Sequence, residues 1–193
     1  MTTILHTYSE KNLKYQVNTL AAVDWLRKKS FQVTSRLTTV EDDESYWKVL
    51  MDYWGEDDLI HFQQDIVPTV AKIESLLDCS YPLCTYPHKL ENSYGLWWGE
   101  WDESVPQNLA NGIGPLNPTA MHWYKQPFPM FAQGSGIALV KINQEIQEAI
   151  PLADIPNRHW STLDLWISSY IARKLDRRWH VHTPPVLHSR MEY

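Results

Sequence analysis

Two hydrophobic periods alternate along the first half of the chain. Apolar residues at every second position, or in short unbroken runs, predict β-strands, and the segments of this kind are 2–7, 31–37, 59–62 and 83–86. Apolar residues that recur every three or four positions predict α-helices, and these positions are Leu13, Val17, Leu20, Val23 and Leu26, then Tyr46, Trp47, Leu50, Met51 and Trp54, then Val70, Ile73 and Leu77. Strands and helices that alternate at this pitch predict βαβ units. We therefore expect an α/β fold, a three-layer sandwich with a mainly parallel central sheet.

Polar residues and prolines mark where these helices begin. Ser9 and either Asp42 or Asp43 are candidate N-caps, and Pro68 suits the first turn of the third helix. The region 87–133 interrupts the pattern, which is typical of a functional loop or lid. Beyond it we expect a strand over Ile137–Ile142, a short helix capped by Asn143, a helix capped by Ser161 and a last strand over Trp179–His182. The apolar positions expected on the helix after Ser161 are Leu165, Ile167, Ile171 and Leu175.

Composition indicates an ordinary globular protein. The chain has 193 residues, 44% of them hydrophobic, and its mean hydropathy is -0.41. This length suits one domain over 1–193. The sequence has neither a long apolar run that would span a bilayer nor the pattern of a signal peptide, so we expect a cytoplasmic protein. The net charge of -6 disfavours broad non-specific binding to nucleic acid.

The cysteines and tryptophans leave several interpretations open. Cys79 and Cys84 are expected to be free thiols in a cytoplasmic chain. Their spacing is also compatible with a disulfide, and a zinc site with His88 is a weaker third option because no second Cys/His pair accompanies it. Several of the ten tryptophans fall within 95–102, where they either line a ligand cleft or fill the core.

The turn Gln63-Gln64-Asp65 follows a predicted buried strand. Ligands of open parallel sheets bind beyond the carboxyl ends of the strands, and carboxylate oxygen is a preferred ligand of Mg²⁺ and Mn²⁺. Asp65 is therefore a candidate metal ligand. The alternative is that Asp65 caps the helix that begins near Pro68.

Three histidines lie close to the C-terminus. His180 and His182 would project from the same face of the last strand, and a Pro-Pro turn precedes His188. A late histidine could join a carboxylate around such an ion. The alternative is that they are histidines of the surface or of the core edge.

Two further segments could act on a substrate. Asp164 falls in the first turn of the helix capped by Ser161, where the helix dipole favours its ionised form. A carboxylate held there could accept a proton from an attacking hydroxyl, or it could simply pair with Ser161 as a capping acid. Gly134-Ser135-Gly136 permits close approach of the backbone to a ligand, although a tight turn is the simpler interpretation.

Taken together, the order of strands and helices, the turn ending in Asp65, the segment Gly134-Ser135-Gly136, the helix start at Asp164 and the late histidines resemble a small GT-A glycosyltransferase of the compact kind found in bacteria and viruses. The resemblance covers most of the chain through architecture and scattered residues. The turn in that family is typically Asp-x-Asp and binds Mn²⁺ or Mg²⁺ with the donor diphosphate. Here Gln63 replaces the first acid, so only Asp65 is carried over as a metal ligand from this turn. The resemblance also implies that one late histidine completes the coordination of the ion, with His188 preferred over His182.

The resemblance implies a metal-dependent transfer of a sugar from a nucleotide-diphosphate donor, a UDP-sugar as the first choice, to an acceptor hydroxyl. It implies a GT-A-like fold, Asp164 as the base of an inverting reaction, and donor contacts from Thr7, Tyr8, Gln64 and 134–136. The acceptor stays open, including a nucleic acid base. Two alternatives also stay open: a metal-dependent hydrolase built on the C-terminal histidines, and a catalytically silent module that binds sugar or nucleotide.

Overall fold

In the computed structural model, residues 1–9, 13–39, 42–86, 128–130, 139–156, 158–159, 163–177, 179–182 and 184–189 can be described. Their elements follow in the order β1 (Thr2–Ser9), α1 (Leu13–Lys28), β2 (Val33–Thr38), α2 (Ser45–Met51), β3 (Asp58–Gln63), β4 (Ile66–Val67), α3 (Val70–Leu77), β5 (Leu83–Tyr86), β6 (Phe128–Met130), β7 (Leu139–Ile142), α5 (Gln144–Ala149), the 3-10 turn η1 (Leu152–Asp154), α6 (Leu163–Arg173), β8 (Trp179–Val181) and β9 (Leu187–His188). Among these elements, no helix has the length and apolar character needed to cross a membrane.

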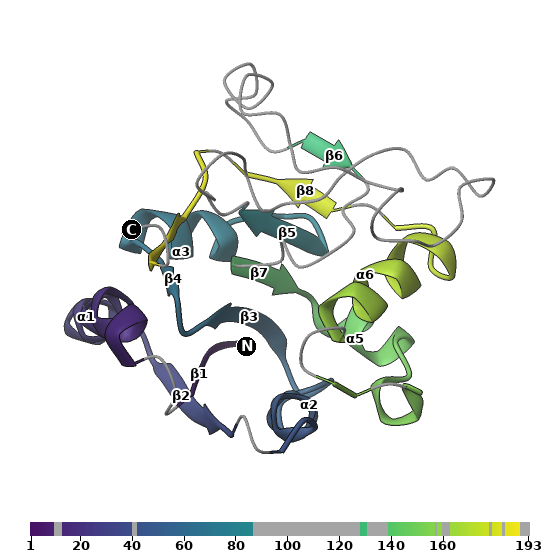
Figure 1. Ribbon diagram of the computed structural model, residues 1–193. Helices are drawn as coiled ribbons and strands as arrows, with labels where there is room; N and C mark the ends of the chain where they lie inside the picture. Colours follow the sequence, from purple (N-terminus) through teal and green to yellow (C-terminus); the bar gives the residue numbers. More distant parts are fainter. Residues whose placement is uncertain are drawn as a thin grey trace.

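A mixed central sheet organises the molecule (Figure 1). Its strands lie in the order β2-β1-β3-β7-β5-β8-β6, and β4 pairs with β9 in a separate two-stranded sheet. The strands β2, β1, β3, β5 and β8 run in one direction, whereas β7 and β6 run against their neighbours. The predicted α/β class and mainly parallel sheet are therefore confirmed.

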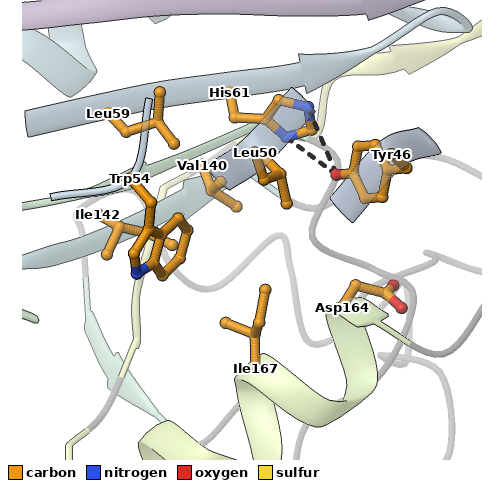
Figure 2. Close-up of a pocket in the computed structure, with 9 residues that line it drawn as sticks. All are labelled: Tyr46, Leu50, Trp54, Leu59, His61, Val140, Ile142, Asp164 and Ile167. Carbon is orange, nitrogen blue, oxygen red and sulfur yellow. Dashed lines mark hydrogen bonds between the residues drawn. The ribbon is translucent and has the colours of Figure 1, made fainter. Parts of the chain in front are cut away.

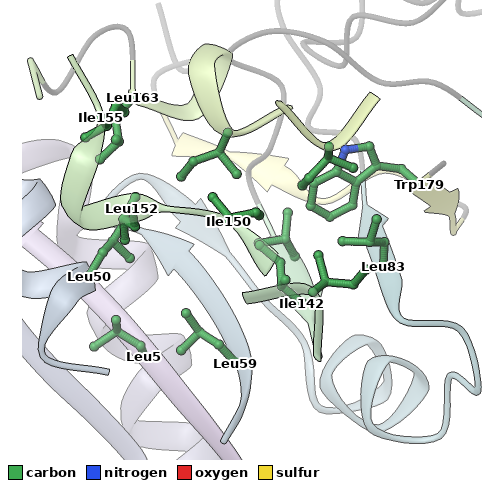
Figure 3. Packing of buried hydrophobic residues seen from close by; sticks show 14 residues of the cluster. Leu5, Leu50, Leu59, Leu83, Ile142, Ile150, Leu152, Ile155, Leu163 and Trp179 are labelled. Carbon is green, nitrogen blue, oxygen red and sulfur yellow. The ribbon is translucent and has the colours of Figure 1, made fainter. Parts of the chain in front are cut away.

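Helices cover both faces of the sheet, as the alternation of elements predicted (Figure 1). Side chains of β3 divide between the faces because successive residues of a strand point in opposite directions. Leu59 joins one core cluster with residues of α2, α5 and α6 (Figure 3), whereas Ile60 and Phe62 join the other with residues of α1 and α3. The sheet thus separates two cores.

The buried face of α1 differs from the apolar stripe predicted for it. Val23 and Leu26 are buried as expected, but Val17 is 63% exposed and Leu20 is 41% exposed. The polar residues Gln16 and Thr19 are buried in their place. The amide of Gln16 donates a hydrogen bond to the carbonyl of Ser9, so this helix is fixed to the end of β1 by a polar contact that hydrophobic periodicity does not detect.

Other local predictions were confirmed or corrected. Asn143 caps α5 by accepting a hydrogen bond from the N–H of Ile146. The cap of α3 is Thr69, so Pro68 lies before the helix and Asp65 does not cap it. On α3, Leu76 is buried in the core where Leu77 was expected, and Leu77 is 36% exposed. The two residues follow Ile73 by three and four positions, and both spacings fit one helix face. The strands β4 and β9 were not predicted, since each has only two residues.

Several predicted features lie outside the described residues. They include Gly134-Ser135-Gly136, the cap Ser161, the tryptophan-rich segment 95–102 and His88. Ser9 is the last residue of β1, and the residues between it and α1 are also outside the described part.

Candidate functional site

The carboxyl ends of the parallel strands meet at one edge of the sheet. Thr7, near the end of β1, lies opposite Gln63 at the end of β3. The first residue of β7, Leu139, lies opposite Phe62 of β3 and Tyr86 at the end of β5. The strands β1, β3 and β5 therefore end at this carboxyl edge, which is where open α/β sheets bind their ligands.

At this edge Asp65 and His188 face each other from distant parts of the sequence. The carboxylate Oδ2 of Asp65 lies 3.5 Å from Nε2 of His188, and their side chains are 6% and 12% exposed. The short pair β4–β9 aligns Ile66 with His188. Ser189 holds the turn in place because its N–H and hydroxyl donate hydrogen bonds to the carbonyl of Asp65 at 2.7 and 3.1 Å.

The distance between these two groups fits shared coordination of a hard divalent ion. Two ligand atoms at neighbouring positions of an octahedral ion, each about 2.1 Å from the metal, stand about 3 Å apart. The observed separation of 3.5 Å is close to that value. The structure thus brings the predicted carboxylate together with the histidine preferred for it, while their role as metal ligands stays a prediction.

The other residues of the turn point to different partners. Gln63 hydrogen-bonds the hydroxyl of Tyr46 on α2, and Gln64 accepts a hydrogen bond from the amide of Gln16 on α1 at 3.5 Å. Gln63, the residue in place of the first acid of the Asp-x-Asp pattern, therefore contacts the α2 side of the sheet. It does not face His188 in the contacts described.

The predicted donor residues of β1 lie on opposite faces of the strand. Thr7 is buried, and its hydroxyl is hydrogen-bonded to Nε2 of His61 at 3.0 Å. The ring of Tyr8 is stacked on the imidazole of His6. Thr7 therefore supports a buried polar contact, and Tyr8 lies over the other core.

Asp164 lines a pocket between the sheet and α6 (Figure 2). Its walls come from α2, β3, β7 and α6, and the lining residues are Tyr46, Leu50, Trp54, Leu59, His61, Val140, Ile142, Asp164 and Ile167. Asp164 is the second residue of α6, so the positive end of the helix dipole favours its ionised form. Because His61 belongs to β3, this pocket lies beside the strand that leads to Asp65.

Burial keeps the other polar groups of the pocket neutral. Desolvation, assisted by the nearby His6, lowers the pKa of His61 to about 3. Desolvation also raises the pKa of Tyr46, and the negative charge of Asp164 raises it further against the opposing hydrogen bond from Gln63. His61 and Tyr46 are thus neutral near pH 7, and the role of Asp164 as a base stays a prediction.

The second histidine predicted to bind the metal, His182, lies elsewhere. Its Nδ1 is 2.9 Å from the hydroxyl of Ser75, and its ring approaches Tyr86. Desolvation, with the nearby His180, Lys72 and Lys141, lowers the pKa of His182 to about 4, so the imidazole is neutral near pH 7. The three late histidines therefore do not form one centre in the described contacts: His188 meets Asp65, and His180 stacks on Tyr81.

Two results differ from what the sequence favoured. Cys79 and Cys84 form a disulfide, so the expectation of free thiols was wrong. Tyr46 and His61 were not singled out as site residues, although the histidine within the apolar run Leu59-Ile60-His61-Phe62 is a signal that could have found the pocket. A polar ring at the centre of a buried strand needs a partner, and here Thr7 provides it.

Comparison with known proteins adds a structural likeness among solved structures. No protein-family model matches the chain, and no curated protein matches it. One similar solved structure is that of CMP:2-keto-3-deoxy-manno-octonic acid synthetase in complex with CTP. The alignment covers 96% of this chain and 90% of the synthetase chain, with a TM-score of 0.47 and 9% sequence identity. The function proposed below rests on the residues of this chain.

Proposed function

We propose that this protein is a metal-dependent glycosyltransferase of GT-A-like fold that moves a sugar from a nucleotide-diphosphate donor to an acceptor hydroxyl. The observation that carries the proposal is the pairing of Asp65 with His188, 3.5 Å apart and largely buried, at the carboxyl edge of the sheet. A carboxylate and an imidazole at that distance suit Mn²⁺ or Mg²⁺. When bound there, the ion would neutralise negative charge on the leaving diphosphate.

Donor binding and proton transfer are assigned to two different places in the proposed reaction. The turn after β3 would bind the donor diphosphate, with Gln64 beside Asp65 as a polar contact. Asp164, in the pocket on the α6 side of the same strand, would accept the proton of the acceptor hydroxyl as that oxygen attacks the anomeric carbon. The bond from this carbon to the diphosphate oxygen then breaks, which gives inversion. A UDP-sugar remains the first choice of donor, on the family resemblance alone.

The two alternative functions receive less support. A hydrolase centre needs His180 and His182 to meet carboxylates. Among the described residues, His182 lies at metal-binding distance from Cys79 and Cys84. This group of three includes no Asp or Glu. A silent binding module would keep the Asp65–His188 pair without turnover, so an activity measurement separates it from the transferase.

The test is release of the nucleoside diphosphate from a panel of UDP-, GDP-, CDP-, ADP- and dTDP-sugars with Mn²⁺, measured with and without a chelator. We expect at least one donor to turn over, slowly by transfer to water and faster with a hydroxyl acceptor. The Asp65→Ala variant should lose this activity while remaining folded. Asp154→Ala is a matched control because Asp154 is an exposed acid at the end of η1. Turnover that survives in Asp65→Ala, or no release from any donor, would overturn the proposal.

A further inference from the structure

Two cysteines and a histidine gather on the side of the sheet covered by α3. Cys79 follows α3, Cys84 belongs to β5 and His182 follows β8, and all three are buried. One ligand atom from each, the two Sγ atoms and a ring nitrogen, lies within 4.8 Å of the others. The backbone supports this arrangement, since the N–H of His182 donates a hydrogen bond to the carbonyl of Thr85, the residue after Cys84. Three separate elements therefore converge on one point.

The imidazole of His182 is held as a ligand histidine is held. Its Nδ1 is hydrogen-bonded to the hydroxyl of Ser75 at 2.9 Å, which fixes the orientation of the ring. Its Nε2 is buried and has no hydrogen-bond partner within the part of the chain that the structure describes. A buried polar atom without a partner destabilises the folded protein. Histidines that bind metals commonly tie one ring nitrogen to a neighbour and give the other to the ion.

We propose that the reduced protein binds a zinc ion through Cys79, Cys84 and His182, and that this ion and the Cys79–Cys84 disulfide are alternative states of the same site. Two thiolates and one neutral imidazole are common zinc ligands, and sites with three protein ligands leave the fourth position to water. This site is separate from the Asp65–His188 pair, and its ligands are softer.

The two states exclude each other for geometric reasons. Thiolates that share a tetrahedral zinc stand about 3.8 Å apart, whereas disulfide sulfurs are covalently bonded at about 2 Å. A dithiol reductant opens the disulfide by donating two electrons and two protons, becomes a disulfide itself and leaves two thiols. Zinc binding then releases both thiol protons.

The charges near the site are compatible with this exchange. The ammonium of Lys141, itself buried, donates a hydrogen bond to the carbonyl of Cys79 at 2.8 Å, and Lys72 lies over the ring of Tyr86. Nearby cations favour the thiolate form of cysteine. Two thiolates would balance the two charges of zinc, so the metal adds no net charge to this buried position.

The test uses Co²⁺ as a spectroscopic substitute for Zn²⁺ and then Zn²⁺ itself, on the full chain after reduction and removal of the reductant. We expect one equivalent of Co²⁺ to give thiolate-to-metal charge-transfer absorption in the reduced protein and none in the oxidised protein. Zinc should displace the cobalt and raise the melting temperature of the reduced form only. The Ser75→Ala variant should bind zinc about 10–100-fold more weakly, as expected for loss of a group that orients a ligand.

Variants separate this site from adventitious binding. Cys84→Ser should abolish the charge-transfer band, and His182→Gln should weaken zinc binding at least as much as Ser75→Ala. His180→Gln is the matched control, because His180 lies on β8, two residues before His182, and is absent from the cluster. Its band and affinity should match the unmodified protein. An unchanged band in Cys84→Ser would overturn the proposal. Equal zinc binding by the reduced and oxidised proteins would also overturn it, and this comparison needs no variant, so it does not depend on how well a variant folds.

Discussion

The hydroxyl oxygen of Tyr46 lies 3.4 Å from each ring nitrogen of His61, in the pocket bordered by Asp164 (Figure 2). Burial holds both groups in their neutral forms near pH 7, with the pKa of His61 lowered to about 3 and that of Tyr46 raised. Neither group is therefore poised to exchange a proton with a substrate at that pH. This relationship leaves the proton transfer of the proposed reaction to the carboxylate of Asp164.

We predict that Asp164→Asn lowers the maximal rate of sugar transfer by about a hundredfold or more, the scale usual for loss of a general base. The Michaelis constant for the donor should change little, because the carboxylate would face the acceptor. Asp176→Asn is the control, since Asp176 is an exposed acid beyond the other end of α6. If Asp164→Asn weakens donor binding and leaves the maximal rate intact, Asp164 contacts the donor instead.

We predict that a nucleoside diphosphate raises the melting temperature only when Mn²⁺ or Mg²⁺ is present. A ligand that binds the native state alone stabilises it by about 2.7 kcal/mol at a hundredfold excess over its Kd. Asp65 and His188 bind the ion together in our proposal, so His188→Gln should remove the metal-dependent shift. His180→Gln should retain it, because His180 stacks on Tyr81, away from this pair in the contacts described. A shift of equal size without metal would contradict the proposed site.

We predict a loss of stability as the pH falls below about 6.5. Desolvation is the main cause of the lowered pKa of three buried histidines, to about 4 for His6, about 3 for His61 and about 4 for His182. Between about pH 6.5 and pH 4 the unfolded chain binds protons that the folded chain does not. The free energy of unfolding should therefore fall by up to about 1.4 kcal/mol per pH unit for each histidine.

Urea denaturation at pH 7.5, 5.5 and 4.5 would measure this slope. His6→Gln should reduce this slope, because the variant removes one of the three buried imidazoles. A free energy of unfolding that stays constant over this range would show that these imidazoles are not buried as described.

We predict that Gln147→Leu destabilises the protein by at least about 2 kcal/mol. The buried amide of Gln147 donates hydrogen bonds to the carbonyls of Asp57 and Ile142 at 2.7 and 2.8 Å and accepts one from the N–H of Gly55 at 2.9 Å. An unpaired buried polar group costs about 1–3 kcal/mol. Chemical denaturation measures the loss, and Gln144→Leu on the exposed side of α5 should cost less. Equal losses would mean that the leucine disturbs α5 regardless of these hydrogen bonds.

The sequence by itself determined the layers of the fold. Alternating hydrophobic periods located β1, β3, β5 and α2, because a strand or helix must bury one face whatever its tertiary partner. The same patterns placed Asp65 just after β3, and the capping chemistry of Asn143 located the start of α5. Local chemistry was sufficient for these features, since each depends on residues a few positions apart.

Only the tertiary structure decided which distant side chains meet. Hydrophobic period cannot detect that Gln16 and Thr19 replace Val17 and Leu20 on the buried face of α1. It also cannot pair strands of two residues, so the β4–β9 contact that brings His188 to Asp65 had no local signal. His182 shares the C-terminal segment with His188, yet the parallel pairing of β8 with β5 carries it to Cys79 and Cys84. His182 and His188, which are close in sequence, thus belong to different sites. The reason is that β8, which His182 follows, and β9 pair with different remote strands, and this pairing fixes the position of each side chain.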